Sequence, residues 1–263
     1  MVTREELLAL VDERREEVRD FLLWARDTER AALEAAKPSW SLRLENRPDI
    51  PDAADAATRF PERWWGLVVF TAFGSKVGAA AAAAEFRRPL PEEEARAALE
   101  RIDFPPRSVG HHRARPGLKG AKRALVSASE DSELFHDALH ATGEPFEARY
   151  ARIRSAHLLE WGRTTTFDLF LRAGALGIGG ETYRPTSAYL AESTGPRSGF
   201  EEVWGRPITR QNADWGEALL RAWTEHWFEV AERVGVDWDV GAAYDPGTFE
   251  NSLCTFRERR DVS

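Results

Sequence analysis

The chain has one cysteine, Cys254, and few lysines. A single cysteine excludes a disulfide within the chain and fits a reducing compartment, so we expect a cytoplasmic protein. The longest apolar stretch, residues 64–86, contains Lys76, and the start of the sequence has no apolar signal core. Both features argue against an association with the membrane. The formal net charge of −8 excludes a surface that attracts nucleic acid everywhere, so a polyanion would have to meet a local basic patch.

Alternating β patterns are nearly absent as well, whereas apolar residues recur at helical spacing. Thr3 and Glu6 form a capping box that predicts a helix at the start of the chain. Residues 38–60 are rich in Pro, Asp and Asn and are expected to form a long loop. The sequence predicts an all-α fold, with at most a small hairpin in its basic segment. We divide it into a helical region, 1–103, and a region that handles DNA and a base, 104–263, which together can form one continuous domain.

The clearest charge asymmetry lies between residues 104 and 129, where no acidic residue occurs. Cations gathered in this way predict a phosphate-contacting segment. An ordinary solvated loop, whose cations pair with acids elsewhere, explains the pattern equally well. The predicted DNA-binding residues of the segment are Arg113, Arg115, Lys119 and Lys122.

An elbow between two helices is predicted around Gly162. The amino end of the second helix would present backbone amides to a phosphate, with Arg163 and Thr164 as further donors. A plain helix connection capped by Thr164 is the alternative.

Residues 193–200 combine two glycines, a proline and polar donors around Arg197, and are expected to form a loop that binds an anion. Gly195 and Gly199 would let the backbone approach a ligand closely, while Arg197 and Ser198 donate hydrogen bonds. In the alternative, Arg197 pairs with a glutamate of the following helix.

Glu250 and Asn251 stand one turn before Cys254. A thiol nucleophile needs a neighbouring base, and the sequence identifies none, so a buried structural cysteine is the better interpretation.

His136 and His140 lie one helical turn apart, a spacing that can chelate zinc. Asp137 stands where zinc proteases carry their general-base glutamate. No third ligand follows at a familiar spacing, although His157 is a candidate. A chance pair of surface histidines is the alternative.

The order of these blocks resembles a phage-derived group of enzymes that hypermodify thymine in DNA. The group includes the helical domain attached to 5-hydroxymethyl-deoxyuridine DNA kinases and the α-glutamyl/putrescinyl-thymine pyrophosphorylases. The similar segments are 116–122, 162–167, 193–200 and 251–256. An acidic residue of the group falls at Arg172, one turn after Asp168. The resemblance implies a glycosylase-like helical fold with a helix-hairpin-helix-type elbow near Gly162.

The resemblance also implies an enzyme that acts on a flipped, 5-substituted pyrimidine and displaces pyrophosphate with an amine. Asp168 and Glu250 are the candidate proton acceptors. Residues expected to bind substrate or phosphate are Arg163, Thr164, Gly195, Arg197, Ser198, Gly199 and Asn251. We expect DNA and a small-molecule amine or amino acid as partners, and no cofactor. The chain lacks the Gly-x-x-x-x-Gly-Lys pattern of a nucleotide kinase. A non-catalytic or glycosylase-like DNA-binding module, and a metal-dependent hydrolase using His136 and His140, stay open as alternatives.

Overall fold

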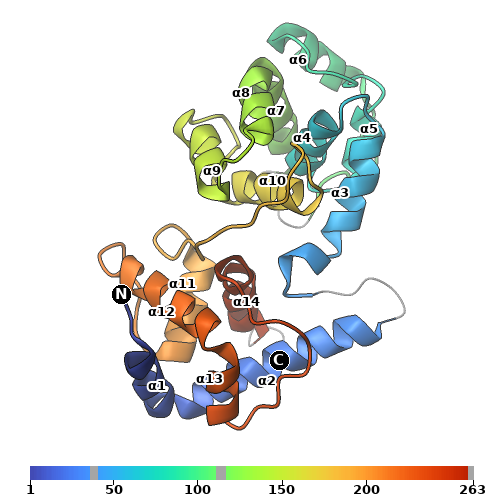
Figure 1. The fold of residues 1–263 in the computed structure, drawn as a ribbon. Helices are drawn as coiled ribbons and strands as arrows, with labels where there is room; N and C mark the ends of the chain where they lie inside the picture. The colour runs from blue at the N-terminus through green and yellow to red at the C-terminus, as the bar shows by residue number, and fades with distance from the viewer. Residues whose placement is uncertain (36–40, 111–116, 260–263) are drawn as a thin grey trace. The chain divides into compact units, whose positions relative to one another are not determined.

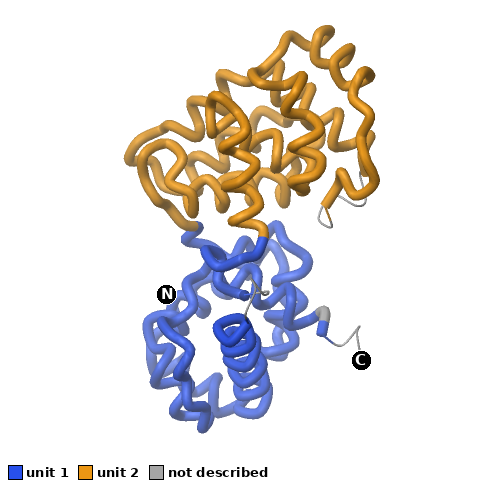
Figure 2. The backbone as a smooth tube through the Cα atoms, turned by 90° about the vertical axis from the view of Figure 1, so that its right-hand side faces the viewer, with its two compact units in different colours: residues 1–48, 185–263 blue, residues 49–184 orange. Residues whose placement is uncertain are grey.

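The structure, a computed structural model, describes residues 1–35, 41–110 and 117–259. Its regular secondary structure within these ranges is entirely helical, so the all-α prediction is confirmed (Figure 1). The chain forms two compact units, residues 1–48 with 185–263 (unit 1) and residues 49–184 (unit 2), coloured separately in Figure 2. The boundary expected after residue 103 lies inside unit 2. No helix in the described ranges is long and apolar enough to cross a membrane.

Unit 1 has an aromatic core. Trp223 lies at its centre, with its ring centroid 5.0–5.7 Å from those of Phe21, Trp204, Trp227 and Phe249. Large aromatic side chains supply much apolar area for a unit of this size. The helices are α1 (Arg4–Glu13), α2 (Arg15–Glu34), the short 3-10 helix η1 (Leu44–Asn46), α11 (Thr194–Trp204), α12 (Ala213–Glu225), α13 (Trp227–Arg233) and α14 (Pro246–Glu258).

Two buried glutamates fix the segments by which the chain leaves and re-enters unit 1. Glu29 accepts a hydrogen bond from the backbone N–H of Leu42 at 2.9 Å. Glu217 accepts from the N–H groups of Ala188 and Leu190 at 2.9 and 2.8 Å. Hydrogen bonds to a charged acceptor are stronger than neutral ones. The second glutamate therefore holds the segment that leads into α11.

Unit 2 is built around α4 (Arg63–Phe73), which packs against α3, α5, α7, α8 and α10. Every residue of α4 from Trp64 to Phe73 is buried, as expected for a helix that is apolar on all sides. Gly74, with φ 63°, ends it in the left-handed conformation that glycine favours. The other helices are α3 (Asp49–Thr58), α5 (Lys76–Ala82), α6 (Glu92–Arg101), α7 (Gly117–Glu130), α8 (Ser132–His140), α9 (Phe146–Ser155) and α10 (Arg163–Ala175).

Two local predictions were wrong. The segment 38–60, expected to be a loop, contains α3, because Asp49 suits the amino end of a helix and Ala53, Ala56 and Ala57 pack inward. The basic segment was allowed a small hairpin. The part of it from Gly117 onward, which the structure describes, forms the start of α7 instead.

Candidate phosphate sites and nucleic-acid interface

The glycine- and proline-rich segment of unit 1 forms the amino end of α11. Ser193 is the N-cap residue with extended backbone, and the helix starts at Thr194. Pro196 lies in the first turn, where a missing N–H costs no helical hydrogen bond. The prediction of a loop at 193–200 was therefore wrong. The amino end of a helix nevertheless carries unpaired amides and the positive end of the helix dipole.

The two glycines of this segment face α14. A Cβ atom at Gly195 would lie 2.4 Å from Sγ of Cys254, and one at Gly199 would lie 2.0 Å from the carbonyl oxygen of Leu253. Both distances are far below ordinary contact. At Gly199 the close atoms are backbone, so a side chain is excluded there, whereas at Gly195 the thiol of Cys254 would have to turn away. The close approach that we expected of a ligand is made here by α14. A part for Gly195 and Gly199 in ligand binding stays a prediction.

Arg197 is half-buried in α11, and its Nε donates to the carbonyl oxygen of Ser193 at 3.1 Å. Across the described residues, no carboxylate lies within ion-pair distance of its guanidinium. Glu202, a glutamate later in the same helix, pairs instead with Arg259 at 2.8 Å. The terminal nitrogens of Arg197 are thus available to an anion near the amino end of α11, and Ser198 is half-buried beside it.

The polar residues of α14 are largely covered. Glu250 and Asn251 are each 8% exposed. The side-chain amide of Asn251 donates to the carbonyl oxygen of Leu42 at 2.9 Å, so Asn251 has a structural role. Cys254 is half-buried against Gly195. The structure thus brings the segments 193–200 and 251–256 together within unit 1.

The elbow in unit 2 connects α9 to α10. Trp161 is buried, and its Nε1 donates to the carbonyl oxygen of Ala124 at 2.9 Å. His157 and Glu160 have positive φ angles of 52° and 66°, a conformation uncommon for residues other than glycine. Gly162 is the N-cap residue, and no side chain caps the helix. The helix-hairpin-helix geometry stays a prediction.

Neither the backbone conformation nor the packing at position 162 requires a glycine. The φ of Gly162 is −70°, which any residue adopts, and a Cβ atom there would meet nothing within 4 Å. It is exposed, as is Thr164. Arg163 is half-buried, with its guanidinium carbon 5.8 Å from the ring centre of Phe167. The amino end of α10 thus has no side-chain cap, and Gly162 and Thr164 are exposed there.

Asp168 belongs to a buried charge network. Arg172 lies 3.4 Å from the Asp168 carboxylate and 2.8 Å from that of Asp49, and it donates to Oγ1 of Thr71 at 3.3 Å. Asp168 and Arg172 are 6% and 3% exposed. This network joins α10 to α3 and α4. A catalytic role of Asp168 stays a prediction.

Residues 112–263 match a family model described as amino acid:DNA transferase. The match spans more than half of the sequence. The chain belongs to the amino acid:DNA transferase family. No curated protein and no solved structure matches it.

The matched part of the chain runs from the basic segment to α14. It contains the amino ends of α10 and α11, and all of α14. The expectation of a DNA-modifying transferase family is confirmed at that level. The helices α1 to α6 precede the match. Between α5 and α6, sequence reasoning missed Arg87 and Arg88, for which the only signal is a pair of arginines before Pro89.

The basic segment of the chain is only partly described. Arg113 and Arg115 lie outside the described residues. Lys119 is exposed on α7. Lys122 donates from Nζ to the carbonyl oxygen of Leu99 at 3.0 Å and lies 5.0 Å from the ring centre of Phe104. Lys119 is therefore better placed than Lys122 for a phosphate contact.

The histidine pair on α8 is a ring stack. The imidazole centroids of His136 and His140 are 4.4 Å apart at an interplanar angle of 25°, and Trp64 meets the His136 ring edge-on. Nδ1 of His140 lies 2.9 Å from the carbonyl oxygen of His136, so that nitrogen has a backbone partner. Where the structure describes the chain, no group of three or more His, Cys, Asp or Glu residues could hold a metal ion. The hydrolase alternative finds no third ligand there.

Proposed function

We propose that this chain joins an amino acid to a pyrimidine base of DNA that has been extruded from the helix. The amine nitrogen attacks the exocyclic methylene carbon of a 5-pyrophosphoryloxymethyl pyrimidine. The carbon–oxygen bond to pyrophosphate breaks, pyrophosphate leaves with the electron pair, and the proton of the attacking nitrogen passes to a carboxylate. Family membership supports amino acid transfer to DNA. The resemblance to thymine-hypermodifying enzymes supports the base and the leaving group.

The observation that carries the proposal is Gly162 at the amino end of α10. An exposed glycine that neither φ nor packing requires leaves room for an outside group to reach the backbone amides. Phosphates bind helix amino ends for this reason. Arg163 and Thr164 stand in the same turn, so we assign a DNA backbone phosphate to this position.

An apolar side chain at the same elbow supports extrusion of the base. Leu159 is 56% exposed and stands between His157 and Glu160, which both have left-handed backbone. Arg123 pairs with the Glu160 carboxylate and so holds the connection. Apolar side chains inserted into a base stack occupy the space that a displaced base leaves. Leu159→Ala should reduce the fluorescence rise of 2-aminopurine placed at the target position, and an unchanged rise would exclude this role.

The amino end of α11 is assigned to the pyrophosphate leaving group. Arg197 has terminal nitrogens that no described carboxylate engages, and they lie where the helix dipole also favours an anion. The attraction of the Arg197 guanidinium and that of the helix dipole both increase with the negative charge that pyrophosphate gains as the carbon–oxygen bond breaks.

Glu250 is the better proton acceptor of the two candidates. It lies one helical turn before Cys254 and so on the same face of α14, and Cys254 contacts Gly195 in the first turn of α11. Asp168, in contrast, lies 3.4 Å from Arg172 within a structural network. We therefore assign the proton transfer to Glu250.

The test is a transfer assay on synthetic duplex DNA that carries 5-pyrophosphoryloxymethyluracil. The protein is supplied with the standard free amino acids, and the DNA is digested to nucleosides for mass spectrometry. We expect one new nucleoside, heavier by the amino acid residue, and release of pyrophosphate. Glu250→Gln should lower turnover by about 10²-fold or more while DNA affinity is retained. Glu201→Gln, an exposed glutamate of α11, is the matched control.

DNA binding without any new nucleoside would favour the non-catalytic module. Release of the free base would favour the glycosylase-like alternative. Equal turnover of Glu250→Gln and the control would remove Glu250 from the reaction.

A further inference from the structure

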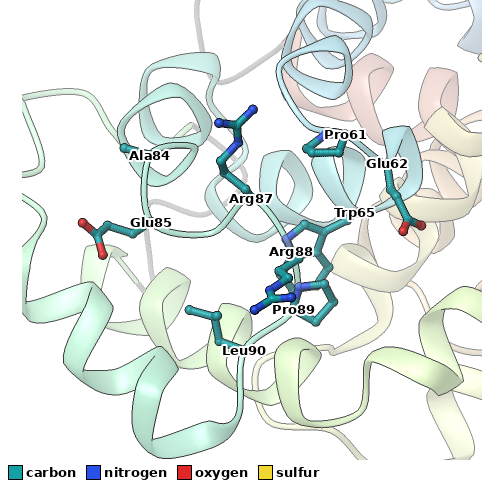
Figure 3. A pocket seen from close by; sticks show the side chains of 9 residues that line it. All are labelled: Pro61, Glu62, Trp65, Ala84, Glu85, Arg87, Arg88, Pro89 and Leu90. Carbon is teal, nitrogen blue, oxygen red and sulfur yellow. The ribbon is translucent and has the colours of Figure 1, made fainter.

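Unit 2 contains a pocket of about 380 Å³, which lies outside the family match (Figure 3). Its walls come from the start of α4, the turn after α5 and the segment that follows. Pro61, Trp65, Pro89 and Leu90 supply apolar surface. The volume falls within the range of small-molecule sites, about 300–1,000 Å³.

The segment that closes the pocket is tied down at both ends. Nε1 of Trp65 donates to the carbonyl oxygen of Phe86 at 2.8 Å, and the N–H of Leu90 donates to Oγ of Ser129 at 2.7 Å. Between these anchors, Pro89 restricts its own backbone and that of the residue before it. The walls are thus formed before any ligand arrives, which lowers the entropic cost of binding.

The acidic side chains around the pocket have partners, whereas its two arginines have no ion-pair partner among the described residues. Glu85 pairs with Arg101 at 2.6 Å, and Glu62 accepts a hydrogen bond from a neighbouring indole. Arg87 and Arg88 are exposed, and neither has an ion-pair partner within the described ranges. Figure 3 places the two arginines between Glu85 on one side and Glu62 on the other. The pocket therefore offers unpaired positive charge flanked by carboxylates.

We propose that this pocket takes up the free amino acid before the amino acid reaches the reacting base, an inference that rests on the proposed function. The planar guanidinium of Arg88, with Arg87 beside it, matches the α-carboxylate. The ammonium group faces Glu62, which keeps acceptor capacity beside its one hydrogen bond. The side chain of the amino acid lies against Trp65 and Leu90. A multiply charged phosphate fits less well, because it would meet two carboxylates.

The experiment measures binding without DNA, so that it is separate from transfer. The standard free amino acids, and inorganic phosphate, are tested one at a time by isothermal titration on the full chain. The amino acid that binds is then compared with its amide, which lacks the carboxylate. We expect one or a few amino acids to bind and the amide to bind at least about tenfold more weakly, the loss of a charge-assisted contact.

Two variants assign the binding to this pocket. Arg88→Ala should weaken the Kd of the amino acid about tenfold or more, and Arg88→Lys should weaken it less. Arg59→Ala is the matched control, because Arg59 is an exposed arginine of the same unit that pairs with Asp55 and does not line the pocket. Equal melting temperatures of the variants would exclude a folding effect.

Three results would overturn the inference. They are no binding of any amino acid, amino acid binding that Arg88→Ala leaves unchanged, and phosphate binding that responds to Arg88→Ala when amino acid binding does not. Each leaves the transfer assay on DNA unaffected. Conversely, the amino acid could bind in a way that depends on Arg88 while the transfer assay yields no modified DNA. That result would count against the proposed function and not against the pocket.

Discussion

A methyl group added at Gly199 tests how closely α11 and α14 pack. The new Cβ atom would lie 2.0 Å from the carbonyl oxygen of Leu253 and 2.6 Å from its carbonyl carbon. Both are backbone atoms, so no side chain can rotate out of the way. The two helices would have to move apart by more than an ångström, and unit 1 would lose packing along their interface.

The magnitude follows from two opposing effects. Replacing glycine by alanine inside a helix gains about 1 kcal/mol through helix propensity. Overpacking costs about 1–3 kcal/mol, occasionally more, and contact with rigid backbone places Gly199→Ala at or above the upper end. We therefore expect a net loss of about 2 kcal/mol, which lowers Tm by roughly 4–8 °C.

Urea unfolding followed by tryptophan fluorescence measures this loss, because Trp204 at the end of α11 and Trp223 lie in the core of unit 1. Gly162→Ala is the control. Its Cβ atom would meet nothing, so it should change stability by no more than about 1 kcal/mol, as an altered N-cap does, and should weaken DNA binding instead. A Gly199→Ala protein as stable as the wild type would refute the close contact.

Four further outcomes are expected. Arg197→Ala should weaken pyrophosphate binding by about 1.5–3 kcal/mol and leave the Tm of the free protein nearly unchanged; loss of Tm without loss of affinity would contradict the assigned role. Lys119→Ala should flatten the slope of log affinity for duplex DNA against log salt by about 0.9, and an unchanged slope would remove Lys119 from the interface. Arg172→Ala leaves two carboxylates without their cation and should cost about 3 kcal/mol in urea unfolding, whereas a loss below about 1 kcal/mol would show that the network is weak. Burial raises the pKa of Tyr183 to about 12, so the phenol ionises in the unfolded chain first; stability should fall from about pH 10 to 12, and less steeply in Tyr183→Phe.

Local signals in the sequence predicted those parts of the fold whose partners are near in sequence. The Thr3 and Glu6 capping box forms both of its hydrogen bonds, at 3.2 and 2.8 Å. Gly74 ends α4 in the left-handed conformation that glycine adopts at helix ends. Both features depend on residues within one or two turns. All the interactions that determine these two features come from a short window of sequence.

The segment 193–200 shows why other parts were not predictable. Its glycines suggested a loop, since glycine lowers helix propensity. Their reason lies in Leu253 and Cys254, more than fifty residues later, whose helix leaves no room for a Cβ atom. A glycine pair four residues apart fits a helix interface and a ligand loop equally well, and only the partner distinguishes them.

The two candidate carboxylates, Asp168 and Glu250, can likewise be distinguished only by their partners in the structure. In sequence, Asp168 and Glu250 were equivalent proton acceptors. In the structure, Asp168 shares the buried guanidinium of Arg172 with Asp49, and Arg172 also donates to Thr71, so the network joins α10, α3 and α4. Removing or protonating Asp168 would leave a buried cation with one partner fewer, so any use of it as a base would act against the fold. Glu250 is not part of the Arg172 network, and it lies on the face of α14 that contacts the amino end of α11. Arg172, one turn after Asp168, thus ties that aspartate to the structure, and the chemistry is expected of α14.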